Sequence, residues 1–261
     1  MGDNMENRYP LFAGGRILKK EALWELRDYA YGSMQLYYMD YTDGIVRGCG
    51  VRVEGNCLVV GRGMLKYGDF LYLLQEEVRV PFAAENRTVV LKAVFTVKKG
   101  NPDYLSYQVD FLLDQDVERQ ENQVELCRFH LREGSVLRGT YKDFADMGTE
   151  YDTVNLLYAT VSGRGQGRLH PEILLQFVEE MQERDGKDAA DMAFCYEIRN
   201  HAGELERAVV LAYLTDKGMV GMAELHGWDN EKIVKEMEGI LLEGRRTTGR
   251  EQGKNVIYVD M

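Results

Sequence analysis

The chain has 261 residues, of which 45% are hydrophobic and 29% charged, and its formal net charge is −11. This composition can bury a core, which excludes wholesale disorder, and no apolar run approaches the roughly 20 residues that span a bilayer. Because lysine and arginine form no stripe, the acidic surface excludes nucleic acid as a partner and disfavours anionic membranes.

The N-terminal residues and the cysteines predict where the protein is found. Residues 1–16 contain no apolar segment of the kind that directs secretion. The four cysteines, Cys49, Cys57, Cys127 and Cys195, are scattered and form no Cys-x-x-Cys pair, so we expect reduced thiols. The expected location is the cytoplasm, or a virion-like particle assembled there.

A first helix is predicted over about residues 19–31. Its apolar residues recur at spacings of three and four, which is typical of one helical stripe, and Gly32 is predicted to end it. The residues of the stripe are Ala22, Leu23, Leu26, Tyr29 and Ala30.

Tyrosine and methionine are concentrated at the end of this helix and just after it. Both residue types are enriched at protein interfaces, so this stretch is the candidate contact surface. The other interpretation is that it packs the helix onto a sheet. The residues are Tyr29, Tyr31, Met34, Tyr37, Tyr38, Met39 and Tyr41.

Residues 43–131 are predicted to form short antiparallel strands. Runs rich in β-branched residues alternate with glycines, and residues 55–56, Gly-Asn, supply the positive φ that tight hairpins require. This punctuation is typical of a β-sandwich or an open barrel. Together with the leading helix, it predicts a β-rich domain over residues 1–145.

Residues 146–261 are predicted to form a mainly helical domain, which makes the whole chain α+β. Pro171 suits the first turn of a helix, and Asp188 with Asp191 is expected to cap the next one. Gly244 is predicted to end the last helix, and residues 255–259 a final strand. The predicted inward residues are Ile173, Leu174, Phe177, Val178 and Met181, then Ala189, Met192, Ala193 and Tyr196, then Leu205, Ala208, Val209 and Ala212, and last Ile233, Val234, Met237, Ile240 and Leu241.

A glycine-rich loop, residues 163–168, precedes the Pro171 helix. Backbone N–H groups of such loops bind phosphates at helix N-termini, so Gly163, Arg164, Gly165, Gly167 and Arg168 are a candidate anion site. The spacing fits neither the P-loop nor the dinucleotide fingerprint. The other interpretation is a flexible connection between the two parts of the chain.

No constellation of catalytic or metal-binding residues is evident. The four histidines include no pair spaced for a zinc protease helix, and a Gly-x-Ser-x-Gly elbow is absent. We therefore expect a protein that is not an enzyme and that has no catalytic residues, no metal and no cofactor.

The N-terminal quarter of the chain resembles a known protein family. The runs YPLFAGGRILKKEALWELRDY (residues 9–29), YTDGIVRGCGVRVEGNCLVVGRGML (41–65) and YGDFLY (67–72) are similar to the N-terminal attachment region of phage tail-fibre and baseplate proteins. They also resemble an uncharacterised family from prophages and contractile-tail gene clusters of Firmicutes. The helical half departs from tail fibres, which continue into repetitive stalks.

The resemblance implies a structural or assembly component of a phage-tail-like baseplate, from a prophage or a contractile injection system. Its partners would be other tail or baseplate-like proteins, and the chain would insert into no membrane. Homo-oligomer formation is left open. The alternative function is a small-molecule or anion-binding protein, or an enzyme, that uses the loop from Gly163 to Arg168.

Overall fold

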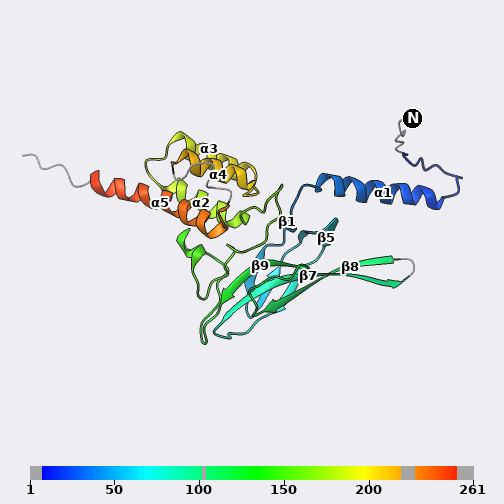
Figure 1. Cartoon of the computed structure of the whole chain (residues 1–261), viewed down its shortest axis with the longest axis horizontal. Helices are drawn as coiled ribbons and strands as arrows, with labels where there is room; N and C mark the ends of the chain where they lie inside the picture. Colours follow the sequence, from blue (N-terminus) through cyan, green and yellow to red (C-terminus); the bar gives the residue numbers. More distant parts are fainter. Residues whose placement is uncertain (1–7, 102–103, 219–226, 252–261) are drawn as a thin grey trace, which may run out of the picture.

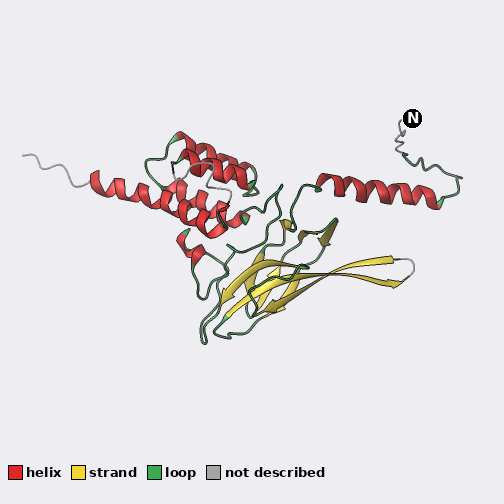
Figure 2. Ribbon diagram, viewed as in Figure 1, coloured by secondary structure: helices red, strands yellow, loops and turns green. Residues whose placement is uncertain are grey.

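The computed structural model describes residues 8–101, 104–218 and 227–251. A single helix, α1 (Lys20–Tyr37), is followed by antiparallel sheets and then by a group of helices. Figure 1 and Figure 2 show the helical group and the sheets in contact, with α1 extending away from both. The predicted α+β class is confirmed.

The first six strands form two small antiparallel sheets, at the glycine-rich hairpins that the sequence predicts. At one of these turns Gly55 has φ 58°, which a side chain disfavours. One sheet has the order β1-β4-β5, and the other has the order β2-β3-β6. The strands are β1 (Gly44–Gly48), β2 (Val51–Glu54), β3 (Cys57–Val60), β4 (Gly63–Tyr67), β5 (Phe70–Leu74) and β6 (Val78–Pro81).

The longest strands form a third sheet with the order β8-β7-β9. These are β7 (Thr88–Asn101), β8 (Tyr104–Asp114) and β9 (Gln123–His130). Lys92 on β7 is 1% exposed, and its ammonium donates to Asp114 Oδ2 at 2.9 Å and to the carbonyl of Glu118 at 2.6 Å. In the described part of the chain the strands form no closed barrel.

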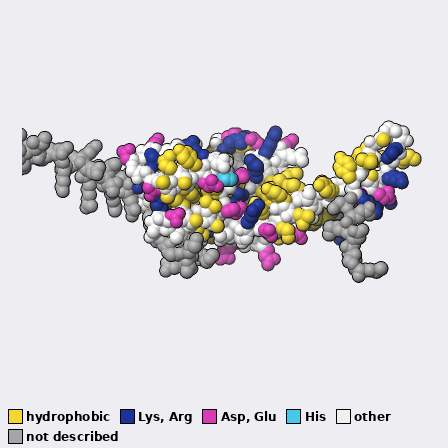
Figure 3. Space-filling view, turned by 90° about the horizontal axis from the view of Figure 1, so that it is seen from above, with side chains coloured by type: hydrophobic (Ala, Val, Ile, Leu, Met, Phe, Trp, Pro, Cys, Tyr) yellow, Lys and Arg dark blue, Asp and Glu magenta, His cyan; other side chains and the backbone are white. Residues whose placement is uncertain are grey.

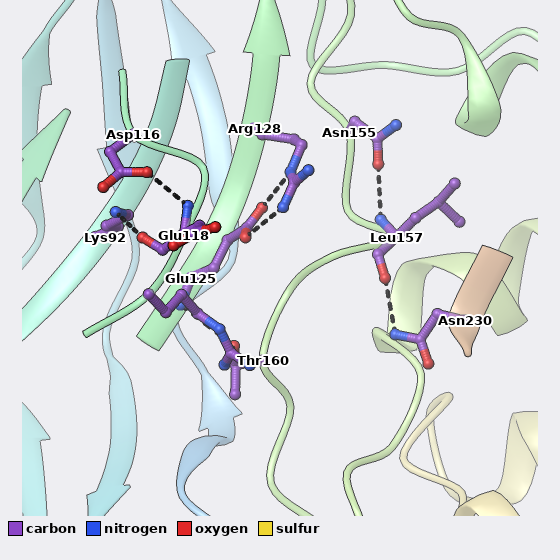
Figure 4. A network of polar contacts seen from close by, with 10 residues as sticks. Lys92, Asp116, Glu118, Glu125, Arg128, Asn155, Leu157, Thr160 and Asn230 are labelled. Atoms are coloured by element: carbon purple, nitrogen blue, oxygen red, sulfur yellow. Dashed lines mark hydrogen bonds and ion pairs between the residues drawn. The ribbon is translucent and has the colours of Figure 1, made fainter. Parts of the chain in front are cut away.

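An extended segment ties the sheets to the helices. After the short 3₁₀ helix η1 (Ala145–Gly148), Asn155 exchanges backbone hydrogen bonds with Arg128 on β9, at 3.0 and 2.8 Å. Figure 4 shows the continuation, in which Asn230 of α5 (Asn230–Glu251) donates to the carbonyl of Leu157 at 2.7 Å. The N–H of Thr160 in the same segment donates to the carbonyl of Glu125 on β9 at 2.8 Å, so the segment bonds to the sheets and to the helices.

The helices after residue 170 pack around the apolar face that the sequence predicts for residues 173–181. α2 (Pro171–Glu183) begins at the predicted proline and buries all five predicted residues. The ring of Phe177 lies against the rings of Phe194 and Tyr213, with centroids 5.9 and 6.0 Å apart. The other helices are α3 (Ala189–Asn200) and α4 (Arg207–Asp216).

The predicted face of α3 is wrong, and of the set predicted for α4 only Leu205, which precedes the helix, is buried. On α3 the buried residues include Phe194 and Ile198, whereas Ala193 and Tyr196 are exposed. The reason is that the ring of Phe194 stacks on the ring of Tyr213 of α4, with centroids 4.0 Å apart. The two helices therefore face each other with the sides that carry these rings. On α4 the same contact leaves Ala208 and Val209 exposed.

The last helix differs from its prediction at one end. All five predicted core residues of α5 are buried, from Ile233 to Leu241. Gly244 does not end the helix, which continues to Glu251. Glycine costs about 1 kcal/mol in a helix relative to alanine, too little to stop one alone. The predicted strand over residues 255–259 lies outside the described residues.

Candidate functional site

Helix α1 extends well beyond its predicted end. It runs to Tyr37, and Gly32 lies within it instead of ending it. The turn after Gly32 also reaches the body, where Gln35 Nε2 donates to the carbonyl of Asp69 at 3.1 Å. This tertiary contact outweighs the low helix propensity of glycine.

Only one side of α1 contacts the rest of the protein. The Tyr31 ring stacks on Phe70 of β5, with centroids 6.1 Å apart. Ala30 and Met34 line a groove of about 330 Å³ together with Leu73 and other residues of β5. The interpretation that this stretch packs onto a sheet therefore holds for a few of its residues only.

The opposite side of α1 is apolar and uncovered. At 3.6 residues per turn, Tyr29 and Leu36 lie opposite Tyr31 and Met34, and Leu26 and Tyr37 lie at the edge between the two sides. Tyr29, Leu36 and Tyr37 are 72%, 69% and 65% exposed, and no residue of the helix is buried. We call Leu26, Tyr29, Leu36 and Tyr37 the outer face of α1. Figure 3 shows hydrophobic side chains on this projecting part of the molecule.

The predicted contact residues divide into two groups. Tyr38 and Tyr41 are half-buried, and their rings meet edge to face with centroids 5.0 Å apart. They form the base of the projecting helix. The remaining predicted residues are exposed: Tyr29, Tyr31, Met34, Tyr37 and Met39. Two of them, Tyr31 and Met34, also line the groove against β5.

The glycine-rich loop lies against this base. Its N–H groups donate to acceptors within the protein: Gly163 to Thr42 Oγ1 at 3.2 Å, and Gly165 to the carbonyl of Asp40 at 2.8 Å. The N–H of Arg164 donates to Glu206 Oε2 at 3.0 Å. The structure thus brings the two predicted sites together.

These contacts explain the glycines without a ligand. A Cβ on Gly163 would lie 2.5 Å from the carbonyl oxygen of Gln166 and 2.6 Å from Arg168 Cγ, so only glycine fits. The Arg164 guanidinium lies 5.6 Å from the centroid of the Tyr41 ring. These N–H groups already donate to acceptors within the protein, one of which is the carboxylate of Glu206. The geometry therefore does not favour an anion bound by the loop backbone.

The other side of the loop lines a cavity of about 460 Å³. Gly167 and Arg168 form part of its wall, together with Arg119, Arg207 and Asn230. These last three residues come from separate segments and share no local motif, so no pattern in the sequence predicts them. The cavity is formed only when the loop between β8 and β9, the extended segment and the helices come together.

A metal site and a membrane-spanning helix are both absent from the described residues. No group of three or more histidine, cysteine or acidic side chains there is arranged to hold a metal ion. Nor does any helix in those ranges have the length and apolar character needed to cross a membrane.

Comparison with known proteins gives a coarse likeness of fold. No protein-family model matches the chain, and no curated protein is significantly similar to it in sequence. The crystal structure of TssK is 10% identical over 92% of this chain and 72% of that one, with a TM-score of 0.38.

Two structures of the type VI secretion baseplate give similar values. A chain of the TssK-TssF-TssG baseplate subcomplex is 8% identical over 92% of this chain and 100% of that one, with a TM-score of 0.41. A chain of the type VI secretion baseplate complex is 10% identical over 91% of this chain and 100% of that one, with a TM-score of 0.32.

Proposed function

We propose that the protein is a structural component of a phage-tail-like baseplate, assembled in the cytoplasm, which acts through protein contacts and not through catalysis. The observation that carries the proposal is α1, a projecting helix whose outer face is left exposed by the residues that the structure describes. The resemblance of residues 9–75 to tail attachment regions supports the same assignment.

An uncovered helix of this kind is costly for a protein that acts alone. Helix α1 has 18 residues, little more than the length of about 12–15 residues below which isolated helices are marginal in water, and most helical stability in proteins comes from packing of an apolar face. Here Leu26, Tyr29 and Leu36 leave that face in solvent. Covering each such side chain would contribute about 1.5–3 kcal/mol, so a partner that covers the helix also stabilises it.

The geometry favours a partner with a groove. Apolar residues at positions 26, 29, 36 and 37 form one stripe, which is how an amphipathic helix binds a hydrophobic groove. Tyrosine suits this role because its ring can be buried while its hydroxyl remains wet. The proposed partners are other tail or baseplate-like proteins.

A triple variant of the outer face tests the proposal. Leu26→Lys, Tyr29→Lys and Leu36→Lys keep the helix, because lysine is a good helix former and position 29 lies four residues after Glu25. We expect the tagged variant to lose at least tenfold of the sheath, tube or baseplate proteins that the wild type recovers from its native host. Its melting temperature should be within about 2 °C of wild type, since surface changes are usually small.

A matched control carries the same charges elsewhere. Val136→Lys, Tyr196→Lys and Leu242→Lys replace three exposed apolar residues on other surfaces and should recover the partners as the wild type does. Equal recovery by the α1 variant and the control would contradict the proposal. So would a wild-type protein that recovers no tail component.

A further inference from the structure

The cavity between the sheets and the helices has an unusual charge. In a protein with net charge −11, its wall carries three guanidinium groups, those of Arg119, Arg168 and Arg207, and one carboxylate, that of Asp43. Asp43 accepts hydrogen bonds from the N–H of Gly68 at 2.9 Å and from Lys66 at 3.4 Å. The Asp43 carboxylate therefore bonds to groups other than the three arginines.

The most deeply placed cation is Arg168, which is 7% exposed. Its Nε donates to the carbonyl of Ser162 at 2.5 Å, and its Nη2 donates to the carbonyl of Val46 at 3.0 Å. Both acceptors are neutral, and no ion pair among the described residues includes this arginine. Buried charges in proteins are ordinarily paired, because an uncompensated one is costly.

Arg207 has the same kind of environment. Its Nη1 donates to Asn230 Oδ1 at 2.6 Å and to the carbonyl of Gly167 at 3.4 Å, which are again neutral acceptors. Burial lowers the pKa of the Arg207 guanidinium, and the charge of the neighbouring Asp229 carboxylate acts in the opposite direction. Arg119, which is exposed, donates to Thr160 Oγ1 at 2.6 Å.

The helix N-termini at the cavity each stand beside a carboxylate: Glu206 is the N-cap of α4, and Asp229 accepts the N–H of Lys232 at the start of α5 at 2.8 Å. Arg207 is the first residue of α4 and Asn230 the first residue of α5, so the N-termini of two helices lie at the cavity wall. A helix N-terminus carries about half a positive charge from its aligned peptide dipoles. Arg168 stands two residues before His170, the N-cap of α2.

We propose that this cavity binds a small phosphate ester, held by the side chains of Arg119, Arg168 and Arg207. Guanidinium groups bind phosphate oxygens with paired hydrogen bonds, and a dianion would neutralise the excess charge. A volume of about 460 Å³ exceeds that of a bare phosphate and falls in the range of small-ligand sites. Thr42, Gln166 and Asn230 offer hydroxyl and amide groups to the rest of such a ligand.

This site differs from a phosphate loop, because side chains and not the N–H groups of residues 163–165 bind the ligand. It is also independent of the α1 outer face, which lies on the projecting helix. Either proposal can therefore fail while the other holds.

Thermal unfolding of the full chain tests the site. Inorganic phosphate and glycerol 3-phosphate are each compared with chloride at constant ionic strength. A ligand that binds only the native state raises the melting temperature in proportion to the logarithm of its concentration. We expect a rise with both phosphates, a larger one with the ester, and the same order of affinity by calorimetry.

Arg119→Gln is the informative variant, because Arg119 is exposed and makes a single hydrogen bond, so the protein should fold. We expect it to bind glycerol 3-phosphate about tenfold more weakly. Arg87→Gln, which removes an exposed arginine that pairs with Glu85 on another surface, should bind as the wild type does. No rise with either phosphate, equal binding by Arg119→Gln and wild type, or an equal rise with citrate would each overturn the proposal.

Discussion

Asp191→Ala is expected to lower the free energy of unfolding by about 3–5 kcal/mol, which is typical of breaking a buried ion pair. Asp191 is 1% exposed. Its carboxylate accepts the Tyr213 hydroxyl at 2.6 Å, the Lys217 ammonium at 2.5 Å and the N–H of Asp188 at 3.1 Å. The variant leaves a buried hydroxyl and a largely buried ammonium with fewer partners, which chemical denaturation will measure.

The neighbouring Asp188 provides a matched comparison. It also bonds to Lys217, at 2.7 Å, but its side chain is 61% exposed. Its other role is to cap α3 by accepting the N–H of Asp191 at 2.9 Å. Asp188→Ala should therefore cost about 1 kcal/mol, the usual value of an N-cap. Equal losses for the two variants would show that burial of the Asp191 carboxylate does not control the stability of this cluster.

The sequence predicts those elements whose signals are local. The proline at α2, the cap formed by Asp188 and Asp191, and the glycine-rich hairpins each lie within a few residues and need no distant partner. The structure confirms all three. The five core residues of α2 and those of α5 are also confirmed, because each set forms a single stripe with polar residues on the other side.

The faces of α3 and α4 could not be derived in this way. Both helices carry apolar residues on more than one side, so the sequence offers two stripes for each. The choice is made by the stack of Phe194 on Tyr213, a contact between helices. Lys92 shows the same limit, since its partner Asp114 lies on the neighbouring strand β8.

Helix α1 shows a different limit. A stripe of apolar residues indicates that a face will be buried, but it does not indicate whether the same chain or another one buries it. The outer face of α1 has such a stripe without a cover. Of the cavity residues, Arg168 belongs to the glycine-rich loop that the sequence singles out, whereas Arg119 and Arg207 had no local signal, because two other segments supply them.

Acid should destabilise the protein by about 2 kcal/mol between pH 7 and pH 5 through His170 alone. His170 is buried at the N-cap of α2, where its Nδ1 accepts the N–H of Glu172 at 3.3 Å. Burial lowers the pKa of His170 from 6.5 to about 4, because the charged imidazolium is poorly solvated there.

The sign follows from which state binds the proton first. Below pH 6.5 His170 binds a proton in the unfolded chain. In the folded chain it does so only below about pH 4. Stability from this residue is therefore complete above pH 6.5 and is lost as the pH falls from 6.5 to 4. The full loss is about 3 kcal/mol, at 1.36 kcal/mol for each pKa unit.

His170→Asn separates this titration from other acid effects. Asparagine is a preferred N-cap, so its side-chain oxygen can accept the same N–H group, but it does not titrate. We expect the variant to be less stable at pH 7, because it is smaller, and to lose about 2 kcal/mol less than wild type between pH 7 and pH 5. His201→Asn, at an exposed histidine, should keep the wild-type dependence. Urea unfolding at several pH values measures all three proteins, and parallel curves for wild type and His170→Asn would show that His170 does not titrate in this range.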